Sequence, residues 1–192
     1  MTLYNSLVAR LARPEHARLA DVAVVVGGSL LMTVAAKTAI PFYPVPLSMQ
    51  TFVAIGLGLA LGPVRGALCV LFYLMQGAGG LPVFAGSPEK GVGLAYMMGP
   101  TGGFLLGFVI QAYVAGLLAE RGWDRTRIGS MAAALIAGAA IYPTGLLWLG
   151  SVIGFDKPVL EFGLYPFILG DIVKAMLAAL VFPLAWQVAR KR

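Results

Sequence analysis

The sequence predicts an all-α integral membrane protein in which six transmembrane helices form a single domain over residues 1–192. Hydrophobic residues make up 59% of the chain and charged residues 11%, whereas about a quarter of the residues in a soluble domain are charged. The mean hydropathy is +0.87. A helix needs about 20 apolar residues to cross a bilayer, so this length allows roughly six crossings and no separate soluble domain of ordinary size.

Apolar runs separated by polar or Gly- and Pro-rich connections place the helices along the chain. Gly62-Pro63 ends the second run, and the sequence "GAGG" ends the third. The third run is short, because about a dozen residues at 1.5 Å each cover less than ~20 Å of a hydrocarbon core about 30 Å thick. We expect the spans at about residues 20–40, 47–62, 64–78, 100–119, 127–153 and 165–188.

The Gly-rich stretch Gly77–Gly86, "GAGGLPVFAG", follows the short third helix. Lipid cannot satisfy the hydrogen bonds of irregular backbone, so such a stretch lies at membrane depth only if protein buries it or a cavity adjoins it. We therefore expect a cavity beside this stretch.

The distribution of Lys and Arg predicts the orientation. With six spans both termini lie on one side, and loops on the cytoplasmic side carry the excess of cations. The opposite connections hold only Lys37, Lys90 and Lys157. The side of the termini holds Arg10, Arg13, Arg18, Arg65, Arg121, Arg125, Arg127, Arg190, Lys191 and Arg192. The termini are therefore predicted to be cytoplasmic, and the irregular connections 37–46, 77–100 and 154–164 to form a lid on the outer side.

Several function classes are excluded by the residues present. The formal charge of +6 would suggest nucleic-acid binding in a soluble protein, but here the cations cluster at the ends of apolar runs, so no nucleic acid is expected. Cys69 is the lone cysteine and offers neither a disulfide nor a zinc spacing. His16, the lone histidine, is expected on the cytoplasmic side. We predict no enzyme, no catalytic residue, no metal and no cofactor.

Asp171 and Lys174 lie three residues apart within the last apolar run. If that helix begins near Tyr165 at the outer interface, they lie about 9 Å and about 13 Å into the membrane and share one helix face. Two readings stay open: a structural ion pair, or a site for a solute or ion. Intramembrane ionisable groups mark functional sites by default, so the sequence favours the second.

The chemistry of the pair suggests the ligand. A carboxylate beside an ammonium suits a small polar molecule with an N–H group and an anionic or carbonyl oxygen. Other polar and aromatic residues at membrane depth could complete an outward-facing pocket, although interhelical hydrogen bonds or simple packing would also explain them. These further candidates are Gln50, Gln76 and Gln111 for hydrogen bonds and Tyr43, Phe84, Tyr96 and Tyr142 for the walls.

Five short motifs in order resemble the BioY family of biotin transporters, over about residues 40–179. They are "IPFYPVPLSMQT" from Ile40, "LGPVRGALCVLFYL" from Leu61, "GLPVFAG" from Gly80, "GPTGGFLLGF" from Gly99 and "GDIVKA" from Gly170. The resemblance implies a six-helix substrate-binding S component of an energy-coupling factor vitamin transporter in the bacterial inner membrane. It implies that biotin lies near the outer side and that Asp171 and Lys174 bind it.

The resemblance also implies partners, a transmembrane coupling subunit and a pair of ATP-binding-cassette ATPases, and it allows that some family members act without a dedicated partner. The chain has no GxxxxGK[ST] phosphate loop, so it cannot supply ATP hydrolysis itself. Small residues four apart in the first helix, Ala23 with Gly27 and Ala35 with Ala39, would allow a partner helix or a neighbouring helix to dock closely. The sequence thus predicts a high-affinity biotin-binding subunit; the alternatives are a transporter of another small amphipathic solute and, less favoured, a structural membrane protein.

Overall fold

The computed structural model describes residues 2–4, 17–40 and 42–191. In this part of the chain four helical stretches are long and apolar enough to cross a membrane: Arg18–Lys37, Gly102–Glu120, Arg127–Ile153 and Val159–Ala189. This confirms the predicted class, a largely helical protein with several apolar spans. Four residues used in the sequence analysis, for the orientation or for excluding histidine-based catalysis, lie outside the described residues. They are Arg10, Arg13, His16 and Arg192.

Helices occupy each of the six predicted segments, and short elements lie between them. The helices are α2 (Ala17–Lys37), α3 (Gln50–Leu61), α4 (Pro63–Ala78), α5 (Gly93–Met97), α6 (Gly102–Glu120), α7 (Arg127–Ala139), α8 (Tyr142–Ile153), α9 (Val159–Gly163) and α10 (Tyr165–Lys191). A 3-10 turn, η2 (Trp123–Arg125), joins α6 to α7. Strands β1 (Ala39–Ile40) and β2 (Leu47–Ser48) follow α2.

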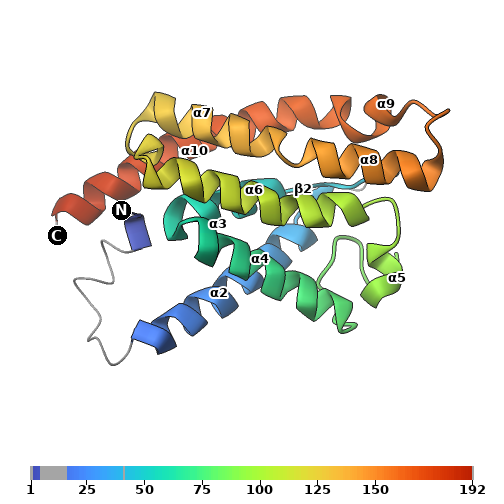
Figure 1. The fold of residues 1–192 in the computed structure, drawn as a ribbon, viewed down its shortest axis with the longest axis horizontal. Coiled ribbons are helices and arrows are strands. Elements are labelled where there is room, and N and C mark those ends of the chain that lie inside the picture. Colours follow the sequence, from blue (N-terminus) through green and yellow to red (C-terminus); the bar gives the residue numbers. More distant parts are fainter. Residues whose placement is uncertain (1, 5–16, 41, 192) are drawn as a thin grey trace.

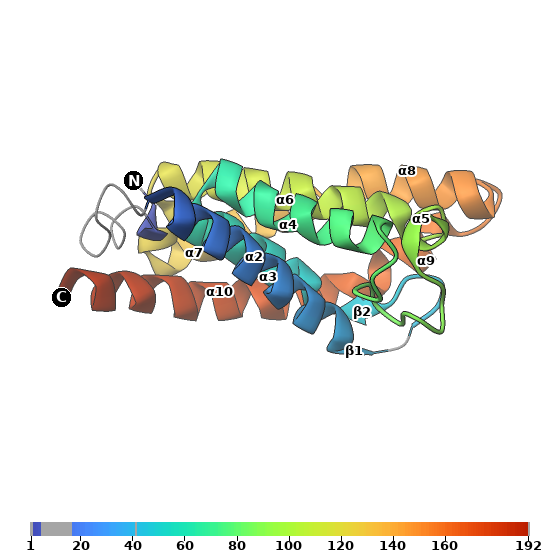
Figure 2. The same cartoon turned by 90° about the horizontal axis from the view of Figure 1, so that it is seen from below.

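The helices run along a common long axis, with α6 packed between the α3/α4 pair and the α7/α8 pair (Figure 1). The beginning of α2 and the end of α10 lie at one end of the bundle, and α5, α9 and the two strands lie at the other (Figure 2). We call the second end the loop end. Its connections bring segments far apart in sequence onto the same end of α3, α6 and α10.

Two details differ from the sequence prediction. The segment 127–153 is not one continuous helix, because α7 ends at Ala139 and α8 begins at Tyr142. Pro143 explains the break: it lacks an N–H, so it suits the first turn of α8 but would remove a hydrogen bond from the interior of one continuous helix. The first helix ends at Lys37 rather than near residue 40, and the chain then forms a two-stranded antiparallel ladder that pairs Ala39 with Ser48 and Ile40 with Leu47. The fold is therefore helical apart from this short ladder.

Glycines let α6 approach α3 and α4 at backbone distance. A Cβ atom on Gly58 of α3 would lie 2.2 Å from the carbonyl oxygen of Ala112, and one on Gly116 of α6 would lie 2.2 Å from the backbone nitrogen of Pro63. Between α3 and α4, Gly62 takes a φ of 88°, a conformation that side-chain-bearing residues rarely adopt. These contacts fix α3 against α6, which brings Gln50 and Thr51 at the start of α3 to the loop end.

Candidate ligand-binding site

Two small adjoining cavities lie at the loop end, each of about 30 Å³. They share five lining residues: Val45, Pro46 and Ser48 from the β1–β2 hairpin and Phe104 and Phe108 from α6. The first cavity is completed by Thr51, Ile141, Tyr142, Phe167, Asp171 and Lys174, and the second by Gln50, Ala85, Tyr96, Thr101 and Leu105. We treat them as one elongated site with two ends.

The charged end of the site is built around Asp171 and Lys174 of α10. Lys174 Nζ lies 3.8 Å from Asp171 Oδ1, and the two side chains are only 11% and 18% exposed, respectively. This separation is longer than a direct hydrogen bond, so the two ions attract each other without satisfying each other. Both can therefore still bind a ligand group placed between or beside them.

Neutral hydroxyls hold both ions in place. Lys174 Nζ donates a hydrogen bond to Thr51 Oγ1 at 2.5 Å. The hydroxyl of Tyr142 donates to Asp171 Oδ2. Thr51 belongs to α3, Tyr142 begins α8 and the ions belong to α10, so three helices converge on this end. The break between α7 and α8 is what places Tyr142 at the beginning of a helix, beside Asp171.

The other end is polar but carries no charge. Gln50 Oε1 accepts a hydrogen bond from Ser48 Oγ at 3.1 Å, and Gln50 Nε2 donates one to the Tyr73 hydroxyl at 2.9 Å. The Tyr96 hydroxyl donates to the carbonyl of Ala85 at 2.8 Å. Burial raises the pKa of Tyr96, which lies in the connection between α4 and α6, so its hydroxyl stays protonated at neutral pH. This end presents a fixed amide and neutral hydroxyls.

Aromatic walls separate the two polar ends. Phe104 and Phe108 are one helical turn apart on α6 and face the middle of the site. Phe167 of α10 stacks on Phe104 with ring centroids 6.3 Å apart. The order along the site is therefore charged, apolar, neutral polar. Such a site suits an elongated amphipathic molecule with a polar group at each end.

The connection between α4 and α5 is tied to the end of α2. Lys37 Nζ, at the end of α2, donates to the Ser87 carbonyl at 2.7 Å and to the Phe84 carbonyl at 3.2 Å. The Gly-rich stretch 77–86 contributes Ala85 to the wall of the neutral end. The prediction of a cavity beside this stretch is thereby confirmed.

The structure brings together five of the nine candidate residues predicted from sequence: Gln50, Tyr96, Tyr142, Asp171 and Lys174; Gln76 lines neither cavity. Tyr43 is 82% exposed and lies outside the cavities. Phe84 is fully buried behind the site, where it stacks on Tyr96 with ring centroids 4.8 Å apart and so supports that wall. Gln111 is fully buried on α6 away from the cavities, and its amide atoms have no hydrogen-bond partner among the described residues.

Sequence reasoning missed several residues of the site. Thr51 is the nearest partner of the Lys174 ammonium, and a polar side chain next to Gln50 in "SMQT" was the available signal. The inward-facing phenylalanines carried no such signal, because apolar residues in a membrane helix face lipid as readily as they face the protein interior. The residues concerned are Ser48, Thr51, Thr101, Phe104, Phe108 and Phe167.

Comparison with known proteins gives consistent similarities. The model of the BioY family matches residues 9–191. A probable biotin transporter BioY of Pyrococcus horikoshii is 40% identical over 151 residues, covering 79% of this chain and 86% of the relative. The biotin transporter BioY of Thermotoga maritima is 38% identical over 152 residues, with the same coverage. The crystal structure of an S component for biotin from an energy-coupling factor transporter aligns with a TM-score of 0.75 at 23% identity, covering 94% of this chain and 96% of that one, and so shares the fold.

Proposed function

Because the chain belongs to the BioY family, we propose that it is a biotin-uptake protein, the substrate-binding membrane subunit of an energy-coupling factor transporter. One observation carries the assignment: the site at the loop end places a charged pair and a neutral polar group at opposite ends of an aromatic passage. Biotin has the matching order of groups, with a ureido group at one end, an apolar ring and chain in the middle, and a carboxylate at the other end.

Each polar group of biotin has a suitable counterpart in the site. The ureido N–H groups are donors for a carboxylate or amide oxygen, and the ureido carbonyl and the valerate carboxylate are acceptors for an ammonium or a hydroxyl. Asp171 supplies an acceptor and Lys174 a donor within one cluster. The aromatic rings between the ends supply apolar contact for the thiophane ring and the chain.

The test is isothermal titration of the detergent-purified protein with biotin. Saturable binding with one biotin per chain supports the proposal. A well-folded protein that shows no heat of binding with biotin, but binds another small amphipathic solute of similar chemistry, would instead support the alternative of a different transported solute.

In this proposal the chain crosses the bacterial inner membrane six times with both termini in the cytoplasm. The excess of cations at the end of the bundle that holds the termini supports that orientation. The shorter helices α3 and α4 also cross. By itself α3 is too short to span the hydrocarbon core. Six of its residues, including Gln50, are buried, so protein rather than lipid surrounds them.

Thr51 provides a test of how the ammonium is positioned. Replacing Thr51 by valine keeps the shape of the side chain but removes the hydroxyl that accepts from Lys174 Nζ. A hydrogen bond to a charged group contributes about 1.5 to 3 kcal/mol, so we expect biotin affinity to fall roughly 10- to 100-fold. Titration calorimetry measures the change. The matched control is Thr144→Val, because within the described part of the chain the Thr144 hydroxyl donates to the carbonyl of Ile141, at the N-cap of the same helix; equal losses in both variants would contradict the role of Thr51.

The proposed function includes a coupling subunit and ATPases as partners, because the chain has no phosphate-binding loop with which to hydrolyse ATP itself. The outward face of α2 supplies a docking surface for such a subunit. A Cβ on Gly27 would meet nothing within 4 Å, and Ala23, one turn earlier, is exposed. The other pair of small residues is less suited, because Ala35 is only 3% exposed and packs inside the bundle.

A bulky residue on this face tests the docking surface. We expect Gly27→Trp to leave biotin affinity within about twofold, because a Cβ at this position meets no atom of the protein within 4 Å, and to abolish co-purification with the coupling subunit by separating the helices. Titration and affinity co-purification measure the two effects. Ile128→Trp, at a position that is 84% exposed on α7, is the control. Retention of the coupling subunit by Gly27→Trp would place the interface elsewhere.

A further inference from the structure

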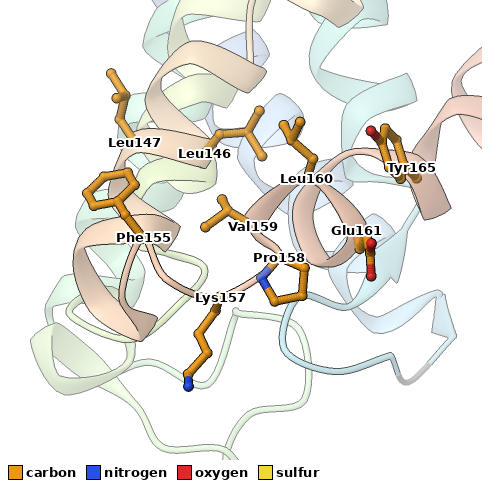
Figure 3. A pocket seen from close by; sticks show the side chains of 9 residues that line it. All are labelled: Leu146, Leu147, Phe155, Lys157, Pro158, Val159, Leu160, Glu161 and Tyr165. Carbon is orange, nitrogen blue, oxygen red and sulfur yellow. The ribbon is translucent and has the colours of Figure 1, made fainter.

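A cleft of about 490 Å³ lies at the loop end between α8 and the α9/α10 junction. It shares no lining residue with the two cavities of the ligand-binding site. Figure 3 shows its apolar walls, which come from Leu146, Leu147, Phe155, Val159 and Leu160. Leu147 and Phe155 are 66% and 68% exposed, so this cleft is an open apolar surface of the protein.

Charged side chains lie along one rim of the cleft. Lys157 and Glu161 line it, and Asp156 Oδ2 lies 3.1 Å from Lys157 Nζ. In Figure 3 the side chain of Lys157 extends away from the leucines, and the carboxylate of Glu161 also lies on the side remote from Leu146 and Leu147. The cleft is therefore amphipathic, with apolar walls and a charged rim.

The position of the cleft in the fold points to lipid. Two of the candidate membrane spans, Arg127–Ile153 and Val159–Ala189, meet at the connection 154–158. The connection between two consecutive spans lies at the membrane surface. There the apolar walls of the cleft face acyl chains and its charged rim faces headgroups.

We infer that this cleft binds a zwitterionic phospholipid, with one acyl chain along the leucines and the headgroup on the charged rim. Charge decides between headgroups. Lys157 can pair with the phosphate, and Glu161 and Asp156 can pair with the ammonium of an ethanolamine headgroup. With one cation and two carboxylates, the rim has a net charge of −1 and repels a headgroup that carries only negative charge.

Native mass spectrometry of the delipidated protein in detergent tests the inference. The protein is titrated with phosphatidylethanolamine and with phosphatidylglycerol that have identical acyl chains. We expect phosphatidylethanolamine to bind roughly three- to tenfold more tightly, as two surface charge contacts would give. Equal affinities, or tighter binding of phosphatidylglycerol, would overturn the inference.

Two double variants assign any preference to the cleft. Asp156→Asn with Glu161→Gln is expected to remove the preference for phosphatidylethanolamine, because it removes both carboxylates that pair with the ammonium. Glu89→Gln with Glu120→Gln is the matched control, because it removes two carboxylates from exposed positions outside the cleft. An unchanged preference in the first double variant would overturn the inference.

Biotin titration of the same samples separates this inference from the proposed function. Neither double variant is expected to change biotin affinity, since the cleft and the ligand-binding site share no residue. Displacement of the bound phospholipid by biotin would mean that the cleft is part of the biotin site, and would overturn the inference.

Discussion

Replacement of Asp171 by asparagine is expected to lower biotin affinity about 30-fold to several thousand-fold. The change removes the negative charge 3.8 Å from Lys174 Nζ while it keeps the size of the side chain and one oxygen for the Tyr142 hydroxyl. Truncating one member of a buried, hydrogen-bonded charge pair costs about 2 to 5 kcal/mol in binding, which corresponds to that range. Isothermal titration measures it, and Asp156→Asn, with a side chain that is 72% exposed, is the control.

A second variant separates ligand binding from structure. If the pair only stabilises the fold, Asp171→Asn leaves Lys174 as an uncompensated buried cation and lowers the melting temperature. Adding Lys174→Gln to Asp171→Asn removes both charges, so the double variant is expected to recover the melting temperature of the parent without recovering biotin binding. A double variant that binds biotin as tightly as the parent would show that the pair does not contact the ligand.

Gly116→Ala is expected to destabilise the protein strongly. The added methyl group would lie 2.2 Å from the backbone nitrogen of Pro63 and 2.4 Å from the carbonyl carbon of Gly62, and neither backbone atom can rotate away. Overpacking costs about 1 to 3 kcal/mol and occasionally more, and a backbone contact belongs at the upper end, so we expect a loss of about 3 kcal/mol. Thermal unfolding in detergent, followed by circular dichroism, measures the effect.

Gly138→Ala is the matched control for this substitution. Both glycines lie in helices, so both substitutions gain helix propensity, but a Cβ on Gly138 meets nothing within 4 Å. Gly138→Ala is expected to be neutral or slightly stabilising. If the two variants unfold at the same temperature, the close approach of α6 to α4 does not limit stability.

The sequence predicted the helical segments and the charged pair because both depend on local patterns. Apolar runs of sufficient length predict helices, and a spacing of three residues places Asp171 and Lys174 on one helix face whatever the helix packs against. Pro143, in the first turn of α8, is also a local signal for the break between α7 and α8. The apolar run is long enough for one span, so residues 127–153 were predicted as a single helix.

The remainder of the site depends on packing between distant segments. Gln50 and Gln111 are both glutamines in apolar helices, and only the tertiary arrangement puts the first in the cavity wall and the second in the core of the bundle. Thr51 and Lys174 are 123 residues apart in sequence. In a membrane helix the inward and lipid-facing sides are both apolar, so hydrophobic periodicity does not identify which phenylalanines line the site.

The opposite charges of Asp171 and Lys174 have an electrical consequence for uptake. The other residues that line the two cavities are uncharged, so the site carries no net formal charge. A biotin anion in this site remains electrically uncompensated. Carrying one negative charge fully into a compartment held 100 mV negative requires about 2.3 kcal/mol of work. In the proposed transporter, accumulation of the vitamin therefore opposes the membrane voltage, and the proposed ATPases would supply that work.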